Sequence, residues 1–168
     1  SANQPTLDRL KKNLRVERIV EWARDASAAG LDVHVTVMLG FPWEDRPEIA
    51  RTVKLARELL IRGWAYTLQV TLVIPYPGTP LFRECETKGW LTTQNWDDFD
   101  MRSCVMRSPA GEAAIKQAIR RIYKAFFHPR VLWNRLLNTR HPLEDLHFYY
   151  RGLRSLWGHL SDFSDRRG

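Results

Sequence analysis

The chain has 168 residues, 44% of them hydrophobic, with seven tryptophans and a formal net charge of +7. This length suits one domain, or one small domain with an extension, and the hydrophobic content excludes wholesale disorder. No run of about 18 or more apolar residues occurs, so a transmembrane helix is not expected, and the first residues lack the layout of a signal peptide.

The cysteines and the charge distribution narrow the class of protein further. Cys85 and Cys104 form no CxxC or CxxxCxxC motif, which predicts a reduced, cytoplasmic setting without a structural metal site. Residues 1–109 carry 15 Lys and Arg against 14 Asp and Glu, whereas residues 110–168 carry 11 against 5. The basic excess of the second segment indicates either a solvated helix face or an anionic partner.

A strand–turn–helix pattern occurs twice in the first half of the chain. The apolar runs 32–40 and 66–75 each stop at a turn containing proline and glycine, and a capped helix follows each turn. This repeat is typical of an α/β protein with a parallel sheet, whose strands are expected to be buried on both faces. Such folds place their chemistry in the loops at the carboxyl ends of the strands.

Helices are predicted before, between and after these strands. Asp45 and Glu48 match a capping box, and Gly63 lies just past the end of the helix that they open. An amphipathic helix is predicted over residues 141–160. The other positions at helical spacing, expected to be buried, are Val16, Ile19, Val20, Ala23 and Ala26, then Ile49, Val53, Ala56 and Leu60, and finally Ile115, Ile119, Ile122 and Phe126.

Three segments taken together resemble the radical S-adenosylmethionine (SAM) enzymes. VMLGFPWED at 37–45 is similar to the fifth strand of these enzymes and the turn that follows it. QVTLVIPYPGTPLF at 69–82, followed by KGWL at 88–91, resembles their sixth strand and its turn. Residues 1–12 are similar to the segment after their fourth strand, and residues 94–163 resemble the tails of members that carry a cobalamin-binding domain.

The resemblance implies an α/β fold in two parts. Residues 1–92 would be the C-terminal portion of a partial (β/α) TIM-like barrel with parallel strands, and residues 93–168 a helical extension. The family binds SAM and a [4Fe–4S] cluster, and cobalamin in one branch. The CxxxCxxC ligands of that cluster are absent from this chain. The partner is therefore expected to be the missing N-terminal part of the barrel, without which no activity is expected.

The resemblance also implies a reaction and a set of site residues. In an intact relative the cluster cleaves SAM reductively, and a radical then drives methylation, rearrangement or cyclisation of a small or lipid-like substrate. No catalytic or metal-binding residue carries over. For Met38 and Ile74, plain core packing is the alternative role. The cofactor-binding residues that carry over are Ser1, Asn3, Met38, Leu39, Gly40, Ile74, Pro75 and Tyr76.

Two other functions stay open at this point. The predicted final helix combines Tyr150 and Trp157 with Arg151 and Arg154, which suits a peripheral membrane-surface module as well as a helix packed on the barrel. A tRNA-modifying radical SAM enzyme is the second alternative. The basic charge fits it, but no RNA-binding module is recognisable, so nucleic acid is not the expected partner.

Overall fold

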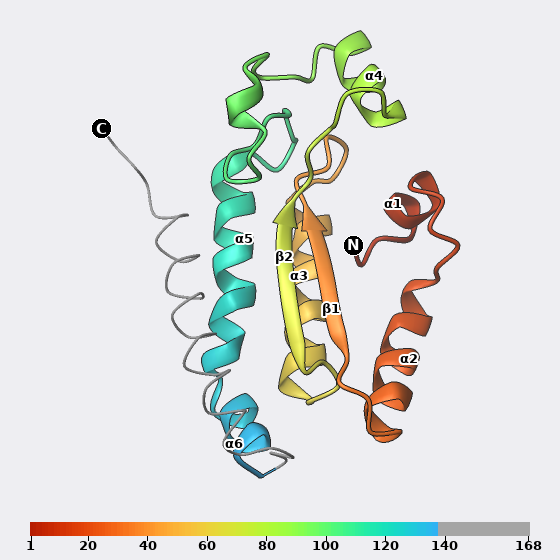
Figure 1. The fold of residues 1–168 in the computed structure, drawn as a ribbon, viewed down its shortest axis with the longest axis vertical. Helices are drawn as coiled ribbons and strands as arrows, with labels where there is room; N and C mark the ends of the chain where they lie inside the picture. Colours follow the sequence, from red (N-terminus) through yellow and green to blue (C-terminus); the bar gives the residue numbers. More distant parts are fainter. Residues whose placement is uncertain (138–168) are drawn as a thin grey trace.

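The structure, a computed structural model, describes residues 1–137. Within them, two parallel strands form a small sheet with helices around it (Figure 1), which confirms a mixed α/β architecture. The predicted helix over 141–160 lies outside the described residues. The elements are α1 (Gln4–Arg9), α2 (Val16–Ala28), β1 (His34–Leu39), α3 (Arg46–Ile61), β2 (Thr67–Leu72), α4 (Pro80–Thr87), the 3-10 turn η1 (Trp96–Asp98), α5 (Glu112–Lys124), the 3-10 turn η2 (Ala125–Phe127) and α6 (Pro129–Leu137).

The sheet has one covered face and one open face in the described part of the chain. The register pairs His34 with Thr67 and Leu39 with Leu72, and burial alternates along both strands. The expectation of burial on both faces is therefore wrong here, because threonine and glutamine alternate with the apolar residues. The covered face carries Val35, Val37, Leu39, Leu68, Val70 and Leu72, and the open face carries His34, Thr36, Met38, Thr67, Gln69 and Thr71.

Helix α3 begins and packs as the sequence predicts. The Asp45 side chain accepts a hydrogen bond from the Glu48 N–H at 2.9 Å, and the Glu48 carboxylate accepts one from the Asp45 N–H at 2.9 Å. This capping box satisfies two N–H groups that a helix start would otherwise leave unpaired. The predicted stripe is buried at all four positions, namely Ile49, Val53, Ala56 and Leu60.

Helix α5 completes the core on the covered side of the sheet. Ile115, Ile119 and Ile122 are fully buried in one cluster with α3 and both strands. The helix begins at Glu112, directly after Gly111, whose backbone has a positive φ of 79°. The predicted division at residues 92 and 93 stays a prediction, although α5 shares the core of the sheet.

Helix α2 packs much less completely than its sequence suggests. Of the predicted stripe, only Ala23 is buried, and Val16 and Ile19 are half-buried. The neighbouring Trp22 is 55% exposed. Figure 1 shows α2 on the side of β1 that faces away from β2 and α5. The apolar side of α2 therefore lacks a complete partner among residues 1–137.

The free edge of β2 is closed by a side chain from α5. The Tyr123 hydroxyl accepts a hydrogen bond from the Val70 N–H at 3.3 Å and donates one to the Val70 carbonyl at 3.4 Å. A sheet edge normally presents such groups to a further strand or to solvent. The buried phenol takes the place of that strand at Val70.

Replacing Tyr123 with phenylalanine should lower the free energy of unfolding by about 1–3 kcal/mol, because both backbone groups of buried Val70 lose their partner. Urea denaturation of the chain measures this change. Tyr76→Phe is the matched control, since the Tyr76 side chain is half exposed. Equal effects of the two substitutions would contradict the edge-closing role of Tyr123.

Candidate functional site

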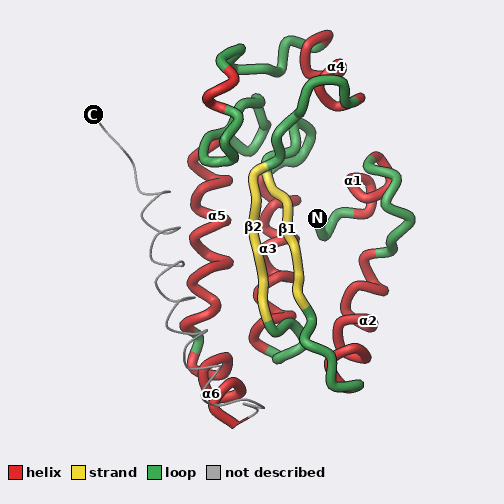
Figure 2. The backbone as a smooth tube through the Cα atoms, in the orientation of Figure 1, coloured by secondary structure: helices red, strands yellow, loops and turns green. Residues whose placement is uncertain are grey.

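The carboxyl ends of the two strands meet at one edge of the sheet. The Val73 N–H donates to the Leu39 carbonyl at 2.9 Å, so the chains stay paired one step beyond the strands. The register pairs Met38 with Thr71 and Leu39 with Leu72, so the predicted segments 38–40 and 74–76 lie at the same end of the sheet, with 74–76 just beyond the last paired residues, where loops gather in Figure 2. The structure brings together two parts of the predicted site that lie far apart in sequence.

The side chains of these two segments differ in accessibility. Met38 is 40% exposed and Tyr76 is 50% exposed, so both can contact a ligand. Leu39, Ile74 and Pro75 are buried in the protein core as whole residues, and the Leu39 carbonyl is already bonded to the Val73 N–H. Nothing in the structure tests cofactor binding by these residues, and that role stays a prediction.

Gly40 sets the direction of the chain as β1 ends. Its φ is +97°, a conformation that side chains of L-residues rarely adopt. A Cβ atom built there would lie 3.8 Å from both Ile115 Cδ1 and Leu72 Cδ2, which is ordinary contact. The requirement for glycine at this position therefore comes from the backbone and not from crowding.

A buried carboxylate ties the first residues of the chain to the turn after β1. Glu44 is fully buried, and its Oε1 accepts hydrogen bonds from Ser1 Oγ at 2.6 Å, Asn3 Nδ2 at 3.0 Å and Thr6 Oγ1 at 2.8 Å. These bonds bring Ser1, the third predicted segment, to the carboxyl end of β1. Glu44 Oε2 is buried and has no hydrogen-bond partner among the described residues.

A second layer of contacts holds this network in place. The side-chain Nδ2 of Asn3 also donates to the backbone carbonyl of Glu48 at 3.0 Å, and the side-chain Oδ1 of Asn3 accepts from Arg51 Nε at 2.8 Å. Trp43 Nε1 donates to Thr6 Oγ1 at 3.1 Å, and the Arg9 guanidinium lies 3.9 Å from the centre of the Trp43 ring. Asn3 is 2% exposed, so here its amide holds neighbouring segments together.

The sequence alone does not identify Glu44, the shared acceptor of this network, as a site residue. In the sequence, Glu44 is recognisable only as part of the turn motif at 37–45, and no motif marks the roles of Thr6 and Arg51. One signal was available, because Glu44 directly precedes Asp45, which opens a capping box. An acidic residue that is not needed for the cap, in a turn between two buried elements, requires a partner of its own.

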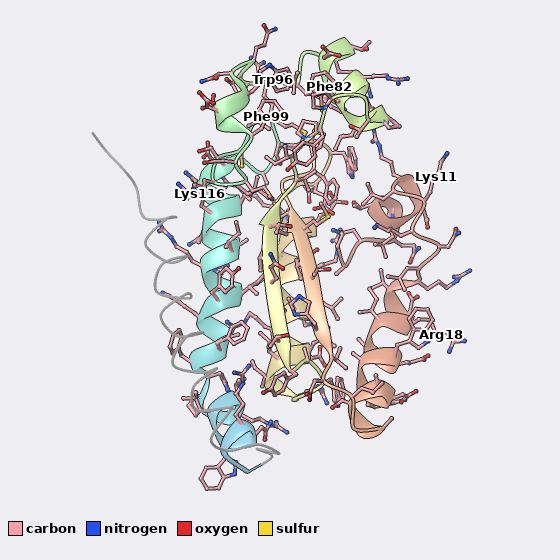
Figure 3. All side chains as sticks on the ribbon, viewed as in Figure 1. Lys11, Arg18, Phe82, Trp96, Phe99 and Lys116 are labelled. Carbon is pink, nitrogen blue, oxygen red and sulfur yellow. The ribbon has the colours of Figure 1, made fainter. Side chains whose placement is uncertain are left out.

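Aromatic side chains gather beyond the end of β2. Trp96 lies 6.1 Å from Phe82 and 5.0 Å from Phe99, measured between ring centres, and Figure 3 shows the three side by side. Trp96 is 58% exposed. This surface comes from α4 and from the connector between α4 and α5 (residues 88–111), and it lies at the same end of the molecule as the turn that carries Tyr76.

A second, smaller core supports the turn after β2. Phe41, Ile74 and Cys85 belong to it, and Cys85 Sγ lies 3.3 Å from Met106 Sδ. Burial raises the pKa of the Cys85 thiol to about 11, and burial likewise raises the pKa of the Cys104 thiol to about 11. Both thiols are therefore protonated near neutral pH and are poor nucleophiles.

Comparison with known proteins gives one informative relative. No known protein-family profile matches the chain. The chain is 30% identical over 134 residues to "Uncharacterized methyltransferase PH0819" of Pyrococcus horikoshii, a match that covers 79% of this chain. The chain spans about 28% of the length of that protein. Within residues 1–137, no group of three or more His, Cys, Asp or Glu is arranged to hold a metal ion.

The Glu44 network predicts a graded response to substitution. Glu44→Ala leaves Ser1, Asn3 and Thr6 without their acceptor and should lower the free energy of unfolding by about 3 kcal/mol or more, since each stranded donor costs about 1–3 kcal/mol. Glu44→Gln keeps one carbonyl oxygen and should cost less. Urea denaturation measures both, with Glu86→Ala as the exposed control. An Ala variant as stable as this control would contradict the role of Glu44.

The raised thiol pKa values predict a loss of stability in alkali. Because the folded state holds these protons more tightly than the unfolded state, the free energy of unfolding should fall as the pH rises from about 9 to about 11. At pH 8 a thiol with this pKa is only about 0.1% thiolate, so alkylation of Cys85 and Cys104 by iodoacetamide should be slow. Equal alkylation rates in buffer and in guanidinium would contradict this prediction.

Proposed function

We propose that the chain is a segment of a SAM-dependent methyltransferase of the radical SAM type, in which the carboxyl ends of β1 and β2 form one wall of the SAM site. The observation that carries this proposal is the convergence of Ser1, Met38 and Tyr76 on one edge of a parallel sheet. The Glu44 bonds hold Ser1 there, and the Leu39–Val73 bond aligns the two strands. The methyltransferase relative supports the reaction class.

The proposed architecture is a portion of a larger (β/α) barrel over residues 1–92, with residues 93–168 as an extension. Two features support it. The strands are parallel neighbours joined through α3, and helices cover one face while polar residues occupy the open face. In a closed or partly closed barrel the helices lie outside and the other face lines the interior. The open face, with Thr36, Gln69 and Thr71, would then line the cavity that holds cofactor and substrate.

The accessible residues at the carboxyl edge suit a nucleoside. Met38 supplies a polarisable apolar surface and Tyr76 a ring, and both can pack against adenine. SAM would supply the transferable group, while these residues would bind and orient it and exclude water. The positive φ of Gly40 sets the direction in which the chain leaves β1 there.

The resemblance also implies a [4Fe–4S] cluster, and cobalamin in one branch. This chain has two cysteines and no CxxxCxxC motif, so the ligands of a [4Fe–4S] cluster would come from another part of the protein. No step through either group is derived from this chain, and a small or lipid-like substrate is the proposed methyl acceptor.

The membrane-surface alternative depends on residues 141–160, which lie outside the described part of the chain. Among residues 1–137, no helix has both the length and the apolar character needed to cross a bilayer. No described contact favours membrane or tRNA binding over the SAM site.

The SAM wall can be tested with Met38→Asp in the longest natural polypeptide that contains this chain. A charge against the base should raise the dissociation constant of SAM by about tenfold or more, a change of about 1.4 kcal/mol, measured by equilibrium dialysis. Met101→Asp is the matched control, because Met101 is 44% exposed and lies in the connector. Unchanged SAM affinity in the Met38 variant would contradict the proposed wall.

The radical type of chemistry needs a separate measurement. After anaerobic reconstitution with iron and sulfide, the same polypeptide should convert SAM to 5′-deoxyadenosine in the presence of a reductant. Methyl transfer that yields S-adenosylhomocysteine without any 5′-deoxyadenosine would contradict the radical assignment while leaving methyl transfer intact.

A further inference from the structure

Helices α3 and α5 enclose a groove that is separate from the proposed SAM wall. Its volume is about 870 Å³, and the described residues that line it all belong to these two helices. No residue of β1 or β2 is among those lining residues, so the groove does not open onto the carboxyl edge of the sheet. A ligand bound there would leave that edge free.

The floor of the groove is apolar and made partly of small side chains. Ile49, Val53 and Ala118 line it and are buried. Ala50 and Ala114 line it as well, and each contributes only a methyl group. Small residues facing each other from two packed helices leave a depression, into which a bulky apolar side chain of a ligand could fit.

The rim of the groove is strongly basic. Its one lining carboxylate, that of Glu58, is already paired with Arg62 Nε at 2.8 Å. Within residues 1–137, none of the lining cations forms an ion pair with a carboxylate. These cations are Arg46, Lys54, Arg57 and Arg121. The rim therefore lacks the negative charge that would balance it.

Two of these cations are held in place before any ligand binds. Arg46 Nε donates to the Ala110 carbonyl at 3.2 Å, and Arg57 Nη1 donates to the Arg121 carbonyl at 2.9 Å. Each bond uses one of the five N–H donors of a guanidinium. Because both side chains are already tethered across the groove, less conformational freedom is lost when their other donors meet a carboxylate.

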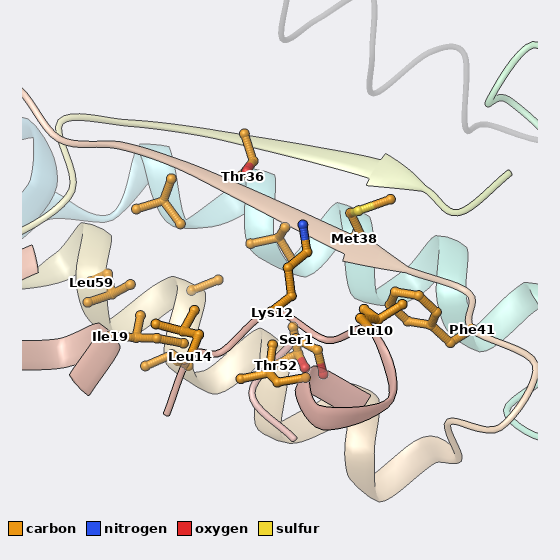
Figure 4. A pocket seen from close by; sticks show the side chains of 15 residues that line it. Ser1, Leu10, Lys12, Leu14, Ile19, Thr36, Met38, Phe41, Thr52 and Leu59 are labelled. Atoms are coloured by element: carbon orange, nitrogen blue, oxygen red, sulfur yellow. The ribbon is translucent and has the colours of Figure 1, made fainter. Parts of the chain in front are cut away.

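A second groove, beside β1, has a different chemical character. Its volume is about 260 Å³, and Lys12 carries the one charged side chain among the residues that line it. Figure 4 shows Lys12 among apolar side chains such as those of Leu14 and Ile19. The combination of an apolar floor with several unpaired cations thus distinguishes the groove between α3 and α5.

We propose that the groove between α3 and α5 binds an amphipathic helix of another protein. The apolar side of that helix lies on Ala50 and Val53, and carboxylates on its flanks pair with the rim cations. The lining residues of α3 extend from Arg46 to Ile61, a length of about 23 Å at 1.5 Å per residue. That length accommodates about four turns of a partner helix, with apolar anchors at i, i+3 or i+4, and i+7.

Charge favours this occupant over the others available. The chain has a net charge of +7, so a second copy would bring mainly repulsion. Residues 138–168, which lie outside the described part of the chain, contain five arginines against four Asp and Glu, and so offer no net negative charge. RNA would satisfy the rim through its phosphates, but it would leave the apolar floor without a partner.

A synthetic helical peptide of about 18 residues, with a leucine stripe and glutamates on both flanks, is the probe. Fluorescence anisotropy should give a dissociation constant of about 50 μM or below for this chain, and the affinity should fall as salt rises from about 0.05 to about 0.5 M. The same peptide with lysine for every glutamate should bind at least about tenfold more weakly. Failure of the acidic peptide to bind would overturn the proposal, including the case in which residues 138–168 cover the groove.

Two double variants locate the binding on the chain. Lys54→Glu combined with Arg121→Glu changes exposed rim residues and should weaken binding of the acidic peptide at least about tenfold. Lys11→Glu combined with Arg18→Glu makes the same change of charge on the α1–α2 side (Figure 3) and should change the affinity less than about twofold. Equal losses in the two double variants would overturn the proposal, because net charge alone would then explain the binding.

The apolar floor has its own test. Ala50→Trp fills the groove without changing its charge and should weaken peptide binding at least about tenfold, whereas Ala50→Ser keeps the size of the side chain and is the matched control. A uridine oligonucleotide of about 20 residues tests the RNA alternative. Tighter binding of this oligonucleotide than of the acidic peptide, with the same affinity in the Ala50→Trp variant, would overturn the proposal. SAM affinity enters neither test, so their failure leaves the proposed function untouched.

Discussion

The arrangement of the carboxyl edge depends on one buried carboxylate. Glu44 has no exposed surface, and a carboxylate in that position is stable only when hydrogen bonds replace its hydration. Ser1, Asn3 and Thr6 supply these bonds from a segment about 40 residues away in sequence. These three bonds to Glu44 Oε1 hold residues 1–6 against the turn after β1.

A second constraint acts through the sheet. Helices α3 and α5 cover one face and supply half of the residues of its core, while the other face keeps polar side chains at every position except Met38. Such a face is suited to a polar cavity and not to a second packed layer. The two edges of the sheet also differ. Tyr123 bonds to the outer edge of β2 at Val70, whereas beside β1 most of the apolar side of α2 is not buried among the described residues.

Features that depend on residues within one helix could be predicted from the sequence. The capping box at Asp45 and the stripe of α3 depend on residues within one helix, so spacing alone identifies them. The burial of the strands and of α2 depends on which elements cover them. Sequence periodicity identifies the apolar side of α2 but cannot say that only Ala23 finds a partner among residues 1–137.

The sequence predicted the strand ends of the candidate site but not the buried Glu44. The edge that collects Met38 and Tyr76 follows from parallel strands, because their carboxyl ends must meet. Glu44 could not be identified in this way, since its three donors lie far away in sequence and only the folded chain brings them to one oxygen. The predicted residues also differ in exposure, because the side chains of Met38 and Tyr76 are accessible while that of Leu39 lies in the core.

The central claim is that the carboxyl ends of β1 and β2 form a wall of a SAM site. A crystal structure of the longer natural polypeptide with SAM bound tests it most directly. The adenine should lie against Met38 and Tyr76, with the remainder of SAM directed over the open face of the sheet. SAM bound at a site that touches neither strand end would contradict the account.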